Sequence, residues 1–194
     1  MITTLWFHNI MSWTGFIERC STGDRNLFLA LSPSRPTAWG RHWNRSMSRL
    51  AEGPAYYILA LLPILFGAAN ARLFFSTMAF GFLIELPAYK LIKRFTRRAR
   101  PCHADLDRES LLPVPDQYSF PSGHTAGAFV LAGATLACFP ALALSAYLFA
   151  LCVGYSRVYN RLHFPADILA GALLGSVSAA LARNLALLAT NPLS

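Results

Sequence analysis

Three separated stretches of this sequence carry side chains suited to phosphate chemistry, and residues 156–167 are the most informative. Within them, His163 and Asp167 are four residues apart, and Pro165 suits the first turn of a helix. We therefore expect both side chains at a helix start, facing one another. A carboxylate beside an imidazole fixes its tautomer and raises its basicity, as a nucleophile or base requires. Arg157 adds a planar fork of donors that fits phosphate.

A second stretch, Pro121-Ser122-Gly123-His124, directly precedes a long apolar run. Ser122 suits a helix N-cap, and Gly123 allows a ligand to approach the backbone closely. Free amides and the helix dipole make such a helix start an anion site. His124 in that first turn is placed to donate a proton to a leaving group. The simpler alternatives are a capped helix with an incidental histidine and, for residues 156–167, a polar turn with a structural ion pair.

The third stretch is the basic run from Lys90 to Pro101, which contains Lys93 and Arg100. A helix should stop near Pro101, because proline has no backbone N–H to donate. Anchoring to lipid phosphates would account for several of these basic residues. Glu85, in the apolar segment before them, is an ionisable residue at membrane depth, and we expect it to pair with a nearby arginine.

The composition is that of a single-domain membrane protein. Of 194 residues, 55% are hydrophobic and 13% are charged, about half of the ~25% usual in soluble domains. The mean hydropathy is +0.40. A formal net charge of +8 in so apolar a chain favours contact with anionic lipid head groups or a phosphate-bearing substrate. Nothing in it resembles a nucleic-acid-binding module, so we expect no nucleic acid partner.

The sequence gives little support for a metal or another cofactor, and we expect none. None of the four cysteines is spaced for a zinc site or a disulfide framework. Asp105 and Asp107 lie in a polar loop, where solvated carboxylates are the ordinary explanation.

The apolar segments predict an all-α fold, a polytopic membrane helical bundle with five transmembrane helices. Residues 54–69, 73–91 and 168–188 give three of them. Residues 125–155 would make one helix about 46 Å long against a bilayer core of ~30 Å, so we expect two short helices that turn at Phe139-Pro140.

The N-terminal part differs from this core. We divide the chain into an amphipathic, interfacial segment, 1–53, and a transmembrane core, 54–194. Residues 1–17 are apolar and aromatic but carry polar side chains, so they form either an interfacial helix or a sixth span. Trp39 and Trp43 lie beside arginines, which suits a helix at head-group depth.

Alternating spans bring the three stretches to one face of the membrane. The second span ends near Lys93, the third begins at His124, the fourth ends at Arg157 and the fifth begins near His163. The topology therefore gathers cations, two histidines and an aspartate at one surface, where they could bind a phosphate, attack it and protonate the leaving oxygen.

The spacing of these residues resembles the three-part signature of the type 2 phosphatidic acid phosphatase family of membrane lipid phosphatases. The parts are Lys93, six residues, then Arg100-Pro101; Pro121-Ser122-Gly123-His124; and Ser156-Arg157, five residues, His163, three residues, Asp167. The resemblance implies a metal-independent phosphatase or diphosphatase with a core of usually six spans. The non-enzymatic alternative is a lipid-binding or transport protein. The related vanadium haloperoxidases are another alternative, but they are larger and soluble.

The resemblance also implies a role for each site residue. His163 would attack phosphorus and form a phosphohistidine, Asp167 would hold and polarise His163, and His124 would protonate the leaving oxygen and then activate water. Lys93, Arg100 and Arg157 would hold the phosphate oxygens, and Ser122 and the Gly123 amide would complete the cradle.

Two cues on orientation disagree. If residues 1–17 do not span, only Arg72 and Arg183 of the 17 Lys and Arg fall on the face opposite the site, which suggests a cytoplasmic site. Bacterial members of the family mostly face the periplasm, and we expect the bacterial inner membrane with a periplasmic site. The sequence does not identify the lipid, because undecaprenyl diphosphate, phosphatidylglycerol phosphate, phosphatidic acid and lipid A phosphates present similar groups. The oligomeric state is not readable either.

Overall fold

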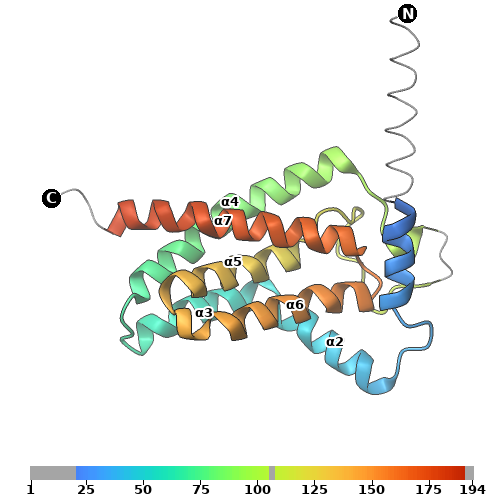
Figure 1. Cartoon of the computed structure of the whole chain (residues 1–194), viewed down its shortest axis with the longest axis horizontal. Coiled ribbons are helices and arrows are strands. Elements are labelled where there is room, and N and C mark those ends of the chain that lie inside the picture. The colour runs from blue at the N-terminus through green and yellow to red at the C-terminus, as the bar shows by residue number, and fades with distance from the viewer. Residues whose placement is uncertain (1–20, 105–107, 191–194) are drawn as a thin grey trace, which may run out of the picture.

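A computed structural model describes residues 21–104 and 108–190, and this part of the chain is helical with no strand (Figure 1). The expectations for residues 1–17 and for Asp105 and Asp107 lie outside it. The elements in order are a helix at 21–31, α2 (Ala38–Leu50), α3 (Gly53–Leu65), α4 (Ala71–Thr96), the 3-10 turn η1 (Pro101–His103), α5 (Gly123–Cys138), the 3-10 turn η2 (Pro140–Leu142), α6 (Ala143–Tyr159) and α7 (Pro165–Thr190).

The five apolar segments all form helices, which confirms the all-α membrane fold. Among the described residues, three stretches are long and apolar enough to cross a membrane: Ala71–His103, Pro140–Tyr159 and Pro165–Ala189. Helices α3 and α5 are apolar but shorter, so the count of five spans stays a prediction. The chain turns at Phe139-Pro140, as expected.

Helix α7 packs chiefly against α5 and α4. Gly171 and Gly175 make the approach to α5 possible. A Cβ on Gly171 would lie 2.5 Å from the carbonyl oxygen of Ser122, and one on Gly175 would lie 2.1 Å from that of Ala126. Only hydrogen fits in this space, so the small-xxx-small pair lets the two backbones meet and fixes their register.

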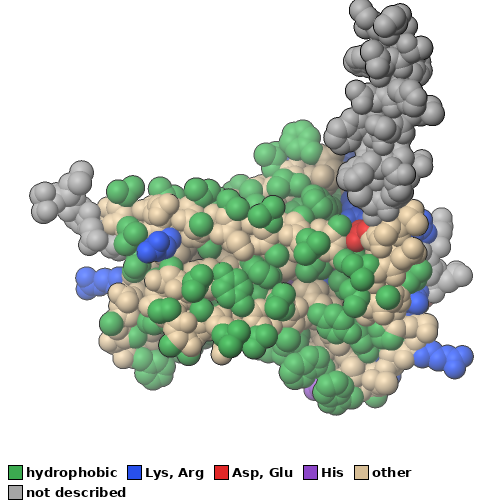
Figure 2. All heavy atoms as spheres, in the orientation of Figure 1, with side chains coloured by type: hydrophobic (Ala, Val, Ile, Leu, Met, Phe, Trp, Pro, Cys, Tyr) green, Lys and Arg blue, Asp and Glu red, His purple; other side chains and the backbone are tan. Residues whose placement is uncertain are grey.

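The outer face of the bundle is apolar, as a bilayer requires. Figure 2 shows hydrophobic side chains covering its middle, with lysine and arginine towards the ends. Exposed side chains on α6 and α7 include Leu144, Leu148, Leu151, Leu169, Leu173, Val177, Leu181, Leu185 and Leu188. Such a surface would be unfavourable in water but is matched to lipid.

Helix α2 buries its polar face and exposes its aromatic one. Asn44 and Ser48 are buried on the side that packs against α6, whereas Trp39 is 75% exposed. The rings of Trp39 and Trp43 stack with centroids 6.0 Å apart. Exposed tryptophans on a helix with several arginines suit a position at head-group depth, as expected from the sequence.

The helix ends that carry the three sequence stretches meet at one end of the bundle. Figure 1 shows the end of α6 and the starts of α5 and α7 there, together with the helix at 21–31. Arg97 ends α4 with a left-handed backbone, φ 46°, and the chain then turns to carry Arg100 inwards. The polar side chains of the three sequence stretches, all within residues 93–167, can therefore share one site.

Candidate active site

The turn between α6 and α7 places His163 against Asp167. Pro165 is the first residue of α7, as expected, so Asp167 lies in the first turn. Its Oδ2 accepts a hydrogen bond of 2.8 Å from the backbone N–H of Phe164. This is the return half of a capping box, which holds the carboxylate over the turn. The same oxygen lies 3.6 Å from Nδ1 of His163.

The other ring nitrogen of His163, Nε2, lies beside Arg100. Arg100 Nη1 lies 3.4 Å from His163 Nε2, and because a guanidinium only donates, Nε2 is the acceptor. The ring proton is then on Nδ1, facing Asp167. His163 is only 2% exposed, and this burial, together with the positive Arg157 and Arg100, holds its pKa well below 6.5. The imidazole is therefore neutral, and its lone pair is on Nε2, towards Arg100.

Arg100 and Arg157 supply buried positive charge beside that nitrogen. Arg100 donates from Nη1 to the carbonyl of Leu162 at 2.7 Å. Arg157 donates from Nη1 to Ser48 Oγ, which orients the guanidinium from α2. Its Nε is buried without a hydrogen-bond partner among the described residues. Since buried N–H groups are almost always paired, this donor is available to an anionic ligand.

Asp116, from the loop before α5, bridges the remaining cations. Its Oδ2 lies 2.6 Å from Lys93 Nζ, and its Oδ1 lies 2.8 Å from Arg100 Nη2. Partial burial raises the pKa of Asp116, but the hydrogen bonds from Lys93 and Arg100 outweigh it, and the net pKa is lowered. An ionised carboxylate thus occupies the position between two cations that a phosphate oxygen would need.

The start of α5 lies on the opposite side of the site. Ser122 is the N-cap: its Oγ accepts from the Thr125 backbone N–H at 3.4 Å and from Thr125 Oγ1 at 2.9 Å. Its own N–H donates to the carbonyl of Asp167 at 3.0 Å, which joins the starts of α5 and α7. Gly123 faces the Tyr89 ring, 3.3 Å from where a Cβ would lie.

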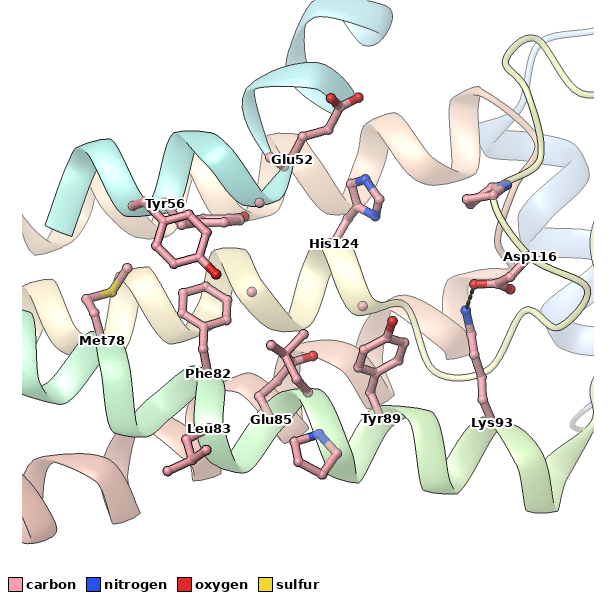
Figure 3. A pocket seen from close by; sticks show the side chains of 18 of the residues that line it. Glu52, Tyr56, Met78, Phe82, Leu83, Glu85, Tyr89, Lys93, Asp116 and His124 are labelled. Atoms are coloured by element: carbon pink, nitrogen blue, oxygen red, sulfur yellow. Dashed lines mark hydrogen bonds and ion pairs between the residues drawn. The ribbon is translucent and has the colours of Figure 1, made fainter.

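These groups line one cavity of ≈ 720 Å³ that extends from the polar end between α3 and α4 (Figure 3). The expected site residues that line it are Lys93, Arg100, Gly123, His124, Arg157 and His163. Ser122 and Asp167 do not line it. Ser122 caps α5, and Asp167 lies beside His163. The far part of the cavity is apolar and includes Met78, Phe82 and Leu83.

The sequence analysis did not predict the cation that pairs with Asp167, which is Arg98. Arg98 Nη1 lies 2.7 Å from Asp167 Oδ1, and its Nη2 lies 2.5 Å from Asp24 Oδ2. Asp24 Oδ1 also accepts from the N–H of Ala166 at 2.9 Å, so the helix at 21–31 caps α7. The basic run suggested Arg98 only as a lipid anchor, and no local signal linked it to Asp24, 74 residues away.

The sequence also did not predict two contacts of the site arginines. Ser48 contacts Arg157 and Asp116 contacts Arg100, and both come from segments without a motif. Glu85 is buried, and no arginine pairs with it within residues 21–104 and 108–190, so its expected partner is absent there.

Comparison with known proteins gives consistent matches. The model of the PAP2 superfamily matches residues 69–189. The chain is 38% identical over 113 residues to a lipid A 1-phosphatase of Rhizobium johnstonii, covering 55% of this chain and 43% of that protein. It is 30% identical over 125 residues to an undecaprenyl-diphosphatase of Sulfolobus acidocaldarius, covering 64% and 61%. The chain thus spans less than two thirds of the length of these two relatives.

The fold also matches a solved structure. The crystal structure of Aquifex aeolicus LpxE superposes with a TM-score of 0.73 at 24% sequence identity, covering 82% of this chain and 93% of that one. At this identity the likeness establishes the fold alone.

Replacing Asp116 should make Lys93 and Arg100 available to bind anions from solution. The variant Asp116→Asn removes the charge that competes for Lys93 and Arg100, so we expect inorganic phosphate to bind about tenfold more tightly, as a lost charge-assisted contact would allow. Calorimetry on the detergent-solubilised protein measures this affinity. Glu109→Gln is the matched control, since it removes the same charge from the same loop. Unchanged or weaker phosphate binding in Asp116→Asn would show that Asp116 only anchors the loop.

Proposed function

The chain belongs to the PAP2 superfamily, and on this premise we propose that it is an integral membrane lipid phosphatase acting on a phosphomonoester or diphosphate of a membrane lipid. The observation that carries the proposal is the neutral Nε2 of His163, which lies beside buried cations at the polar end of a cavity whose other end is apolar. That combination fits a ligand with an anionic head and a hydrocarbon tail.

In the first step, His163 Nε2 attacks phosphorus as the bond from phosphorus to the leaving oxygen breaks. His124, which lines the same cavity, gives its proton to that oxygen. The product is a phosphohistidine and a dephosphorylated lipid. Asp167 offsets the positive charge that develops on the imidazole, because its Oδ2 lies 3.6 Å from Nδ1.

In the second step, water attacks the phosphohistidine. His124, now neutral, takes a proton from this water, the P–N bond breaks, and inorganic phosphate leaves while Nε2 regains its lone pair. Lys93, Arg100 and Arg157 offset the charge on the phosphate oxygens in both transition states. Asp116 must release Lys93 and Arg100 when phosphate binds, because it holds both of them in the free protein.

The substrate class consists of membrane lipid phosphates such as undecaprenyl diphosphate, phosphatidylglycerol phosphate or phosphatidic acid. The apolar part of the cavity, between α3 and α4, would receive the hydrocarbon chain. Relatives named as a lipid A 1-phosphatase and an undecaprenyl-diphosphatase support a lipid substrate without selecting one. We place the protein in the inner membrane of a bacterium, with the site facing the periplasm.

Hydrolysis should depend on His163. The variant His163→Gln removes the nucleophile, and we expect phosphate release from lipid phosphates to fall by at least about a thousandfold, because covalent catalysis is lost. The assay uses a panel of lipid phosphates and diphosphates in chelator. His103→Gln is the control, since His103 is exposed and outside the cavity. Failure of the wild-type protein to release phosphate from every lipid in the panel would refute the proposal.

The nucleophile should stay neutral in mildly acidic solution. Because burial and neighbouring arginines lower the pKa of His163, the unprotonated ring persists below pH 6.5, where a model histidine takes up a proton. NMR of protein labelled with carbon-13 at histidine, with His163 assigned by its loss in His163→Gln, should show no protonation of this ring down to pH 6. A transition near pH 6.5 or above would contradict the assignment of His163 as a neutral nucleophile.

The side of the membrane can be tested at Cys102, which is partly exposed near the site. In a variant whose other cysteines are replaced (Cys20→Ser, Cys138→Ala and Cys152→Ala), a membrane-impermeant thiol reagent should label Cys102 in cells with a permeabilised outer membrane. Labelling only after the inner membrane is also opened would place the site in the cytoplasm, as the charge bias suggests.

A further inference from the structure

Glu85 lies in the cavity on the same face of α4 as Lys93. Glu85, Tyr89 and Lys93 follow one another at four-residue spacing, and Figure 3 shows all three on one side of the helix. Eight residues separate Glu85 from Lys93, or about 12 Å along the helix axis. Glu85 is therefore deeper in the bundle than the phosphate end, at the level where the apolar part of the cavity begins.

One oxygen of the Glu85 carboxyl group lacks a hydrogen-bond partner in the described chain. The residue is 1% exposed, and its Oε1 has no hydrogen bond within the described chain. Lys90 is the nearest cation along the sequence, but it forms no ion pair with Glu85 in the described residues. A buried acceptor left unpaired destabilises the fold, so its presence in a cavity indicates a group that a ligand satisfies.

A second unpaired polar group faces the same region from another helix. The hydroxyl of Tyr56, on α3, is buried and has no hydrogen-bond partner among the residues described. Its ring packs against Phe82, with centroids 5.1 Å apart, and both residues line the cavity with Glu85. Two helices thus present unsatisfied oxygen atoms to the same cavity.

The hydrocarbon chain of a lipid cannot satisfy these groups, and neither can a phosphate. Phosphate oxygens accept hydrogen bonds and are negatively charged, so they belong with Lys93, Arg100 and Arg157. A carboxyl oxygen in an apolar site needs an O–H or N–H donor. The hydroxyl of Tyr56 forms no hydrogen bond with Glu85 in the described chain, so the donor must come from the part of a substrate that lies between its phosphate and its chains.

Resting on the proposed lipid phosphatase activity, we infer that Glu85, assisted by Tyr56, selects lipid phosphates whose backbone carries a hydroxyl or amide N–H between the phosphate and the hydrocarbon chains. Sugar-based and amide-linked lipids have such donors. Polyprenyl diphosphates and phosphatidic acid do not, and they would leave the carboxyl group unpaired. A site built to hydrogen-bond a substrate group rejects analogues that lack it.

A pair of lipids with matched chains tests this selection. Ceramide 1-phosphate carries an amide N–H and a hydroxyl on the carbons that follow its phosphate-bearing carbon. Phosphatidic acid carries only esters at the corresponding positions. In mixed micelles, we expect wild-type kcat/KM to favour ceramide 1-phosphate by about tenfold, and Glu85→Leu to bring the ratio close to one. Undecaprenyl diphosphate serves as a third substrate without donors in its chain.

Two further variants separate recognition from folding. Glu85→Gln keeps an acceptor oxygen and should retain part of the preference, and Tyr56→Phe keeps the ring and should reduce the preference less than Glu85→Leu. Thr77→Val is the control, because Thr77 is buried on α4 but does not line the cavity, and the ratio should not change. Thermal unfolding of each variant in detergent identifies any loss of fold.

The outcomes distinguish this inference from the function on which it rests. Equal rates on the matched lipids, a preference that persists in Glu85→Leu, or wild-type turnover of undecaprenyl diphosphate alone would overturn the role of Glu85 and leave the phosphatase activity standing. Absence of phosphate release from all three lipids and from the wider panel would refute both.

Discussion

The buried carboxylate of Asp167 is the group on which the rest of the site depends. It is excluded from solvent, it is compensated by Arg98 and by the N–H of Phe164, and it faces the imidazole of His163. Its own backbone carbonyl receives the N–H of Ser122. A buried charge is tolerated only when it is paired and hydrogen-bonded, so this one residue requires α7, α5 and the segment after α4 to meet.

The close approach of the helices is what allows that meeting. Gly171 and Gly175 let α7 lie against the backbone of α5, and the starts of both helices then reach the same level of the bundle. In a bilayer, lipid chains are as apolar as the helices, so close packing of small residues supplies the association that water would otherwise drive. The geometry at His163 thus depends on side chains several turns away from it.

The cavity has two regions with opposite chemistry. Around His163 and Arg157, buried cations and one neutral imidazole create a site for an anion, which Asp116 fills in the free protein. Between α3 and α4 the lining is hydrocarbon, interrupted by Glu85 and Tyr56. The order of these regions along α4 follows the order of groups in an amphiphile: head, backbone and chain.

The sequence by itself determined the helices and which of their ends lie together, because hydropathy, proline positions and motif spacing are local properties. It predicted Pro165 as a helix start, the turn at Phe139-Pro140, and a cluster containing Lys93, Arg100 and His163. Tertiary structure decided which partners complete that cluster. Asp24 with Arg98, and Ser48 with Arg157, are joined by packing across 74 and 109 residues, so no local pattern reveals them. Tertiary structure also decided the surroundings of Glu85. Its Oε1 has no hydrogen-bond partner in the described chain because of the cavity around it, which only the folded bundle creates.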